Sequence, residues 1–130
     1  MPATYQPEQS VISVQGRFDA NGAAEFDRVW ASIPADRPHV IVDLTGVAYI
    51  SSIGIRSLVI AEKALRARQG YVILAGVSKF VKTVLEPSGL PREFPLASTV
   101  VEATNAIHAA GSEKHPPTEH TISGRHYRYH

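Results

Sequence analysis

The hydrophobic and polar positions follow two different periods, which alternate along the chain. Apolar and polar residues alternate over residues 11–15 (VISVQ), and nearly continuous apolar runs occupy residues 40–44 (VIVDL) and 71–75 (YVILA). Alternation is typical of a half-buried strand, whereas a short β-branched run is typical of a parallel strand covered on both faces. Segments with helical spacing follow these runs. The pattern therefore predicts an α/β domain with buried parallel strands joined by right-handed crossovers.

Apolar residues recur at helical spacing in four segments, each of which is expected to pack against the sheet. The predicted stripes are Ala23, Phe26, Val29 and Ile33 in the first, Ile55, Leu58, Ala61 and Leu65 in the second, Phe80, Val81, Val84 and Leu85 in the third, and Val100, Val101, Ala103 and Ile107 in the fourth. Short polar residues that commonly cap helices lie before three of them: Asp19 or Asn21, then Ser51 or Ser52, then Ser78.

The apolar periodicity ends near residue 110, which divides the chain into a domain and a tail. Residues 1–110 form the predicted domain, in which Pro87-Ser88-Gly89 ends the third helix and a short edge strand is expected around Phe94. Residues 111–130 contain a Pro-Pro pair and four of the six histidines, without any apolar repeat. We expect residues 111–130 to be a flexible tail.

The composition is that of an ordinary globular domain. With 130 residues, 44% of them hydrophobic, the chain has room for one core. Its formal net charge of +1 gives no electrostatic footprint for nucleic acid or an anionic membrane. The chain has no cysteine, no signal-peptide pattern at its N-terminus, and no apolar run near the roughly 20 residues of a membrane span. We expect a cytoplasmic domain without nucleic-acid or membrane partners.

Residue types that carry catalysis or bind metals do not converge in the sequence. The glycines of a nucleophile elbow are missing around Ser78, and the common phosphate-binding glycine motifs are absent. His39 begins the strand whose end leads to Ser51 and Ser52, so the imidazole and the hydroxyls are expected at opposite ends of the sheet. The tail histidines follow neither a helix face nor a hairpin. We therefore expect no enzyme, no cofactor and no metal site.

The junction between a buried strand and the second helix holds two adjacent serines, Ser51 and Ser52. One interpretation is a plain N-cap, which contributes about 1 kcal/mol to the helix. The other is a hydroxyl displayed for modification, since a phosphate at a helix N-terminus meets free N–H groups and a favourable dipole. Arg56 lies one turn from Ser52 and could pair with that phosphate. A partner docked there would have to bury a dianion, so phosphorylation would release it.

Three segments of the chain match motifs of one family. GRFDANGAAEF (residues 16–26) is similar to an element G-R-[LF]-D-A, and VDLTGVAYISSIGIRSL (residues 42–58) is similar to D-L-[ST]-x-V-x-[FY]-[IM]-D-S-[ST]-G-L-x-x-L. Residues 70–103 have a strand, a helix, S-G-L and a final helix in family order. On these residues the chain resembles the STAS domains, the family of anti-sigma factor antagonists, over about residues 5–110. The resemblance implies a mixed four- to five-stranded sheet with about four helices, packed mainly on one face.

The resemblance also implies a function, a binding domain without catalysis of its own. Many family members bind an anti-sigma factor that is also a serine kinase of the histidine-kinase-like ATPase fold. Phosphorylation of the motif serine breaks that complex, and a PPM-type serine phosphatase restores it. The family phosphoserine falls on Ser52, the glycine on Gly54 and the next leucine on Ile55. Arg56 and the exposed face of its helix would contact the partner, and Gly54 would let the partner's backbone approach closely.

The sequence departs from the family signature at two positions. Ser51 replaces an aspartate, which makes Ser51 a second candidate phosphoacceptor, and Ile53 replaces a second hydroxyl residue. Ser51, Ile53, Gly54, Ile55 and Arg56 are thus the expected partner-binding residues. Asp43 and Thr45 are expected to shape the serine turn.

Two alternatives remain open on the sequence. One is a constitutive, non-phosphorylated scaffold subunit of a transporter or lipid-handling complex. The other is a nucleotide- or anion-binding domain that uses the helix N-terminus.

Overall fold

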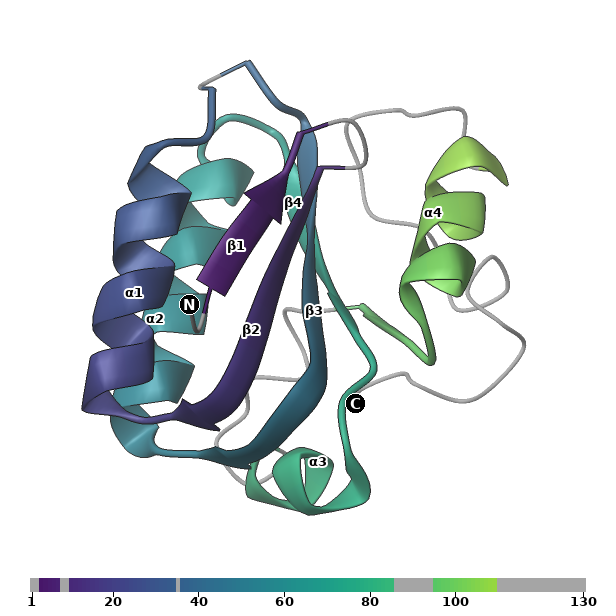
Figure 1. Ribbon diagram of the computed structural model, residues 1–130. Helices are drawn as coiled ribbons and strands as arrows, with labels where there is room; N and C mark the ends of the chain where they lie inside the picture. The colour runs from purple at the N-terminus through teal and green to yellow at the C-terminus, as the bar shows by residue number, and fades with distance from the viewer. Residues whose placement is uncertain (1–2, 8–9, 35, 86–94, 110–130) are drawn as a thin grey trace.

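The computed structural model describes residues 3–7, 10–34, 36–85 and 95–109, which form a five-stranded sheet with four helices (Figure 1). In chain order the elements are β1 Ala3–Gln6, β2 Val11–Phe18, α1 Ala20–Ala31, β3 His39–Ile50, α2 Ser52–Arg66, β4 Tyr71–Ala75, α3 Lys79–Leu85, β5 Leu96–Ala97 and α4 Val100–Ala109. The predicted α/β class is confirmed, and so are the mixed sheet and the number of helices.

The sheet has the strand order β1-β2-β3-β4-β5. The pairs β2–β3, β3–β4 and β4–β5 are parallel, as the buried apolar runs predict, and β1 pairs antiparallel with β2. The sequence analysis missed β1, because four residues are too few to establish an alternating pattern. It also made β2 and β3 too short, since both strands continue beyond their predicted ends at residues 15 and 44.

Two hydrophobic layers cover the two faces of the sheet. Alternate residues of β3 divide between them: Val40 and Val42 face one layer and Ile41 faces the other. The first layer contains side chains of α1, α2 and α3, and the second contains those of α4. Figure 1 shows α1 and α2 together on one side of the strands and α4 on the opposite side. The helices therefore pack mainly on one face, as expected.

Two side chains assigned to apolar stripes are exposed instead. Phe80 is 55% exposed and Val101 is 68% exposed. Each has a neighbour that takes the inward position, because successive residues of a helix are about 100° apart and cannot both face the sheet. In α3, Val81 and Leu85 are buried, and in α4 the buried residues include Ala103 and Ile107.

The predicted caps of α1 and α3 are confirmed. The side chain of Asp19 accepts a hydrogen bond from the N–H of Gly22 at 3.2 Å, and Ser78 Oγ accepts one from Val81 N–H at 3.1 Å. The predicted helix end at residues 87–89, the edge strand around Phe94 and the tail at residues 111–130 lie outside the described residues. Among the described residues, the short strand β5 forms the edge of the sheet beyond β4, and β1 forms the other edge.

Candidate functional site

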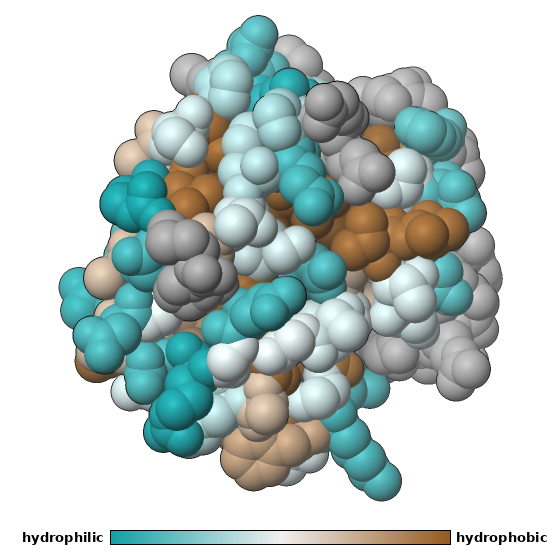
Figure 2. Space-filling model, viewed as in Figure 1, coloured by the Kyte–Doolittle hydropathy of each residue, from teal (hydrophilic) through white to brown (hydrophobic). Residues whose placement is uncertain are grey.

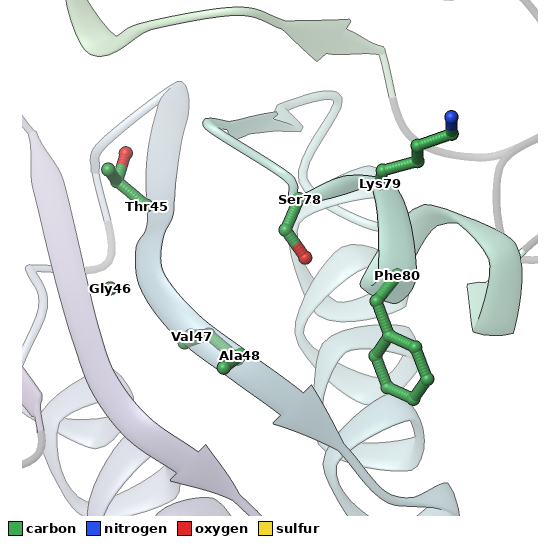
Figure 3. A pocket seen from close by; sticks show the side chains of 7 residues that line it. All are labelled: Thr45, Gly46, Val47, Ala48, Ser78, Lys79 and Phe80. Atoms are coloured by element: carbon green, nitrogen blue, oxygen red, sulfur yellow. The ribbon is translucent and has the colours of Figure 1, made fainter.

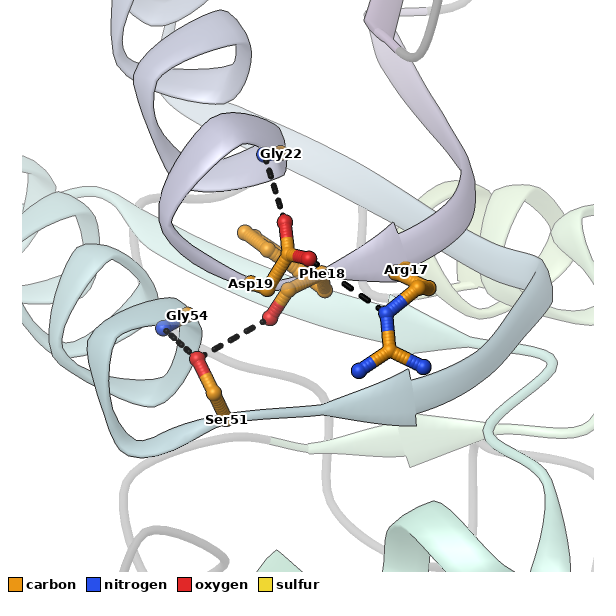
Figure 4. Close-up of polar contacts among 6 residues, drawn as sticks. All are labelled: Arg17, Phe18, Asp19, Gly22, Ser51 and Gly54. Atoms are coloured by element: carbon orange, nitrogen blue, oxygen red, sulfur yellow. Dashed lines mark hydrogen bonds and ion pairs between the residues drawn. The ribbon is translucent and has the colours of Figure 1, made fainter.

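The ends of β2 and β3 and the starts of α1 and α2 meet at one edge of the sheet (Figure 4). Phe18, the last residue of β2, pairs with Ile50, the last residue of β3. The backbone N–H of Ser51 donates to the carbonyl oxygen of Phe18 at 3.0 Å. This hydrogen bond ties the serine junction to the neighbouring strand, and so fixes where α2 begins.

Ser51 is the N-cap of α2. Its hydroxyl oxygen accepts a hydrogen bond from the N–H of Gly54 at 3.3 Å and donates to the carbonyl oxygen of Phe18 at 3.4 Å (Figure 4). The side chain is half-buried, and both hydrogen-bonding roles of the hydroxyl are in use. The capping interpretation of the serine pair therefore applies to Ser51.

Ser52 is the first residue of α2 and is exposed. Within the described part of the chain its hydroxyl makes no hydrogen bond, so it is available to an approaching molecule. The two interpretations of the serine pair thus fall on different residues: Ser51 caps the helix, and Ser52 displays a hydroxyl beside the free N–H groups of its first turn.

Gly54 does not lie on the exposed surface where we expected a partner's backbone to approach. It is buried, and a Cβ atom built on it would collide with the carbonyl oxygen of Phe18 and lie 2.9 Å from Phe18 Cδ1 and 3.0 Å from Ile50 Cγ1. Gly54 is therefore needed for the close packing of α2 against the strand ends. Its absent side chain opens no surface to solvent.

The other expected partner-binding residues divide by exposure. Ile53 is 50% exposed and Arg56 is exposed, and Arg56 makes no ion pair with any described residue. Ile55 is half-buried and packs against the hydrophobic layer of α1 and α2. Together with Ser52, the side chains of Ile53 and Arg56 form a small exposed surface at the start of α2, which we name the serine surface.

Asp43 and Thr45 lie within β3 and not in the serine turn, which corrects their expected role. The pairing of β2 with β3 is irregular here, since Ser13 pairs with Asp43 and Gln15 with Gly46. Asp43 Oδ1 accepts hydrogen bonds from the Thr45 N–H at 3.0 Å and from the Thr45 hydroxyl at 2.6 Å. The carboxylate satisfies an N–H at the bulge, so the pair stabilises an irregular strand.

Arg17 is a residue of this edge that the sequence analysis missed. Its guanidinium carbon lies 4.1 Å from the centroid of the Tyr49 ring, and its Nε lies 3.4 Å from Asp19 Oδ2. The hydrogen bond from Gly22 N–H, and secondarily the one from Arg17, holds the pKa of Asp19 below its usual value. Arg17 and Asp19 both belong to the sequence element G-R-F-D. The sequence analysis did not predict that this element lies beside the serine junction, and that prediction would have pointed to Arg17.

A hollow of about 490 Å³ lies between β3 and the start of α3. Its lining residues are Thr45, Gly46, Val47, Ala48, Ser78, Lys79 and Phe80 (Figure 3). In Figure 3 the ring of Phe80 lies across from Ala48, and Lys79 points away from β3. Because α3 follows the carboxyl end of β4, the exposed Phe80 lies at the same edge of the sheet as the serine surface.

In the described part of the chain, the histidine of β3 and the serine pair lie far apart. His39 begins β3 whereas Ser51 follows its end, which confirms that the imidazole and the serines lie at opposite ends. In the described ranges no three His, Cys, Asp or Glu residues gather as a metal site would require. No helix among the described residues combines the length and the apolar character needed to cross a membrane.

Comparisons with known proteins agree with this architecture. The family model described as STAS domain matches residues 1–103. A curated relative from Bordetella bronchiseptica, named "Putative anti-sigma factor antagonist BtrV", is 30% identical over 101 residues, covering 77% of this chain and 87% of the relative.

Two solved structures share the fold. The anti-sigma factor antagonist SpoIIAA in its unphosphorylated form matches with a TM-score of 0.61 and 15% identity, over 85% of this chain and 97% of that chain. A sulfate transporter family protein from Wolinella succinogenes matches with a TM-score of 0.58 and 18% identity, over 88% of this chain and 81% of that chain. With the family model spanning the described sheet and nearly all of its helices, the chain belongs to the STAS domain family.

Proposed function

We propose that this domain is a cytoplasmic anti-sigma factor antagonist, without catalysis of its own, whose partner binding is switched by phosphorylation of Ser52. The observation that carries the proposal is the division of roles between the two serines. Ser51 holds the helix in place through its hydroxyl, and the hydroxyl of the exposed Ser52 has no structural role among the described residues.

This division favours Ser52 over Ser51 as the phosphoacceptor. A phosphate on Ser51 would replace the hydroxyl that accepts from Gly54 and donates to Phe18, and would have to fit into a half-buried position. A phosphate on Ser52 leaves both hydrogen bonds intact. The modification can then change the surface of the domain without unfolding it.

The electrostatics of the helix start also support Ser52. A phosphoserine carries about −1.5 to −2 charges at neutral pH. At the first position of α2 such a charge gains roughly 0.3–1 kcal/mol from the helix dipole. Arg56, one turn on and without an ion-pair partner in the described chain, can add a charge-assisted hydrogen bond. The free domain therefore tolerates the charge, whereas an interface laid over it does not.

The serine surface has the composition of a small docking site. The exposed Ile53 supplies apolar contact and Arg56 supplies a cation, and both lie within about one turn of the proposed phosphoacceptor Ser52 on α2. The exposed ring of Phe80 lies at the same edge of the sheet and offers a second apolar side chain there. Ser51 and Ile55 shape this surface from below, and Gly54 sets how closely α2 approaches the strands.

The partner in this proposal is an anti-sigma factor that is also a serine kinase of the histidine-kinase-like ATPase fold. A PPM-type serine phosphatase would remove the phosphate and restore binding. Two comparisons support the choice: the relative BtrV carries the name of an anti-sigma factor antagonist, and the fold neighbour SpoIIAA is described in an unphosphorylated form.

A constitutive scaffold role is the second candidate. The likeness to a sulfate transporter family protein from Wolinella succinogenes is the observation that favours it. In that role Ser52 would lie at the start of α2 without being modified, and charge at this position would leave partner binding unchanged.

The first experiment asks whether Ser52 is modified in the cells that make this protein. Intact-mass and peptide mass spectrometry on protein isolated during growth and during stress should detect a phosphate on Ser52 with an occupancy that changes. Absence of phosphate on Ser52 under all conditions would contradict the switch and favour the scaffold.

The second experiment asks whether charge at Ser52 releases the partner. We expect wild-type protein and Ser52→Ala to capture the same kinase, and Ser52→Asp to bind it about a hundredfold more weakly, equivalent to about 2.7 kcal/mol. Ala20→Asp is the matched control, since residue 20 is the first residue of α1. Equal binding by Ser52→Asp, with an unfolding transition like that of the wild type, would contradict the proposal.

A further inference from the structure

A second, more enclosed pocket lies at the opposite edge of the sheet from the serine surface. It has a volume of about 280 Å³ and lies between the amino end of β3 and α4. Residues from three parts of the chain line it: Ser10 before β2, Arg37 and His39 at the start of β3, and His108 in α4. No residue of the serine surface contributes to it, so it is a separate feature of the domain.

The charged and titratable groups that line this pocket from the described part of the chain are all cationic or basic. They are Arg37, His39 and His108, and no Asp or Glu is among the described lining residues. Arg37 is half-buried and makes no ion pair with a described residue. Burial, and then the nearby Arg37 and His108, lower the pKa of His39. The three basic groups therefore influence one another electrostatically, and no carboxylate among the described lining residues balances them.

The remaining walls of the pocket are apolar or already held in place. Ile41 and Ile107 are buried in the layer between the sheet and α4, and Figure 2 shows hydrophobic surface gathered in the region between the strands and α4. The Ser10 hydroxyl donates to the His39 carbonyl oxygen at 2.6 Å, which fixes the start of β3. The His39 ring stacks on Tyr71 with 5.9 Å between centroids. The pocket is thus preformed on two sides.

The polar groups around His39 are not all satisfied by the protein. Its Nδ1 atom is buried and makes no hydrogen bond within the described part of the chain. The hydroxyl of Thr104, which also lines the pocket, makes none there either. Unbalanced positive charge and unused hydrogen-bonding groups in one small cavity are features of an anion-binding site.

We propose that the pocket formed by Arg37, His39 and His108 binds a small anion, a molecule with a phosphate or carboxylate group. Arg37 would pair with the anion as a permanently charged fork, and His108 would close over it from α4. The volume of about 280 Å³ lies just below the range of about 300–1,000 Å³ that small-molecule sites occupy, so the ligand is small. Two imidazoles beside a guanidinium, without a carboxylate, are a poor set of metal ligands.

Binding should depend on pH in a defined direction. A bound anion favours the protonated forms of His39 and His108, so by linkage the affinity rises as the pH falls. Of the other groups that face His39, Arg37 stays charged, and burial raises the pKa of Tyr71 to about 12, which keeps it neutral near pH 7. Imidazole is therefore the kind of side chain in this pocket through which the binding of an anion can respond to pH.

The test is a titration of the ¹⁵N-labelled protein followed by amide chemical shifts. Inorganic phosphate, sulfate and acetate are the probes, with sodium chloride at matched ionic strength as the blank. We expect saturable shifts of amide signals in residues 37–41 and 104–108, and tighter sulfate binding at pH 6 than at pH 8. Sulfate serves for the pH comparison because its own charge is constant there. Tighter binding of phosphate than of acetate would indicate a phosphate-containing ligand, and the reverse would indicate a carboxylate.

Three variants complete the test. Arg37→Gln should weaken binding about tenfold or more, and His108→Gln should reduce the pH dependence. Lys63→Gln removes a similar charge from an exposed position on α2 and should leave binding unchanged. The proposal is overturned if no probe gives saturable shifts, or if the Arg37 and Lys63 variants bind equally well. Either result is independent of the role of Ser52.

Discussion

The starts of α1 and α2 share one capping arrangement. Their differences show which residues the fold requires and which are available for binding. In each, a capping side chain follows a strand end and accepts the N–H of a glycine three residues on: Asp19 with Gly22, and Ser51 with Gly54. Both glycines press against the end of β2, where an added Cβ would meet the carbonyl oxygen of Arg17 or of Phe18. This shared arrangement is what two adjacent helices need in order to begin at one sheet edge.

The differences lie in the residues that capping does not require. α1 begins with an anionic cap and continues with Ala20 and Asn21, whereas α2 begins with a neutral cap and continues with Ser52 and Ile53. The first helix therefore forms without an exposed hydroxyl or an exposed isoleucine in its first turn. Ser52 and the 50% exposed Ile53 are unexplained by helix formation, which is why we assign them to binding.

We expect the largest loss of stability when a methyl group is added at Gly22 or Gly54. Gly54→Ala would place Cβ against three atoms at 3.0 Å or less, one of them a backbone oxygen, whereas Gly22→Ala meets only the Arg17 oxygen as closely, at 2.5 Å. Overpacking costs typically 1–3 kcal/mol, and a helical alanine returns about 1 kcal/mol. We expect a net loss of about 1–2 kcal/mol for Gly54→Ala and a smaller one for Gly22→Ala, measured by urea unfolding. Equal stability of all three proteins would show that the strand ends can move apart.

A smaller effect is expected at the serine pair itself. Ser51→Ala removes the hydrogen bond to Gly54 N–H and should lower the free energy of unfolding by about 1 kcal/mol. Ser52→Ala is the control, and should change it by less than about 0.5 kcal/mol, as at ordinary surface positions. The measurement is again urea unfolding at neutral pH. If Ser52→Ala were the costlier change, the assignment of the cap to Ser51 would be wrong.

The smallest expected effect is on the pH dependence of stability, which should differ between the charged cap Asp19 and the neutral cap Ser51. The pKa of Asp19 in the folded chain lies below its ordinary value of 3.8, so its contribution to stability is present above that value and is lost as the pH falls through the folded pKa. Asp19→Asn keeps a capping oxygen without the titratable charge. The stability difference between wild type and Asp19→Asn should shrink in acid, whereas that between wild type and Ser51→Ala should not. A constant Asp19→Asn difference at pH 7 and at about pH 3 would contradict this assignment.

The features that could be predicted from the sequence are those that depend on residues close together in the chain. The parallel strands, the Asp19 and Ser78 caps, and the separation of His39 from the serines all follow from local patterns. Gly54 was assigned to a partner because its true neighbour, Phe18, is distant in the sequence and adjacent only after β2 and β3 pair. Asp43 and Thr45 were expected to shape the serine turn because the predicted strand ended at residue 44, whereas β3 continues to Ile50. The carboxylate instead stabilises a bulge, through which β3 continues.

The exposed Phe80 was missed for a similar reason. Adjacent Phe80 and Val81 both suit an apolar stripe, and only the packing of the short α3 decides between them. The pocket around Arg37, His39 and His108 brings together the start of β3 and a helix near the end of the described chain. No sequence motif predicts such a cavity, because its formation depends on how α4 packs across the sheet.

The carbonyl oxygen of Phe18 has a consequence for recognition of the serine junction. It accepts from both the backbone and the hydroxyl of Ser51, so the first turn of α2 is held by a strand that belongs to an earlier part of the chain. A linear peptide carrying the letters ISSIGIR would have the same hydroxyls without this anchor, and a helix so short is marginal in water. Under the proposed function, an enzyme that modifies Ser52 would therefore meet a folded epitope. Its specificity would reside in docking to the domain more than in the residues next to the acceptor.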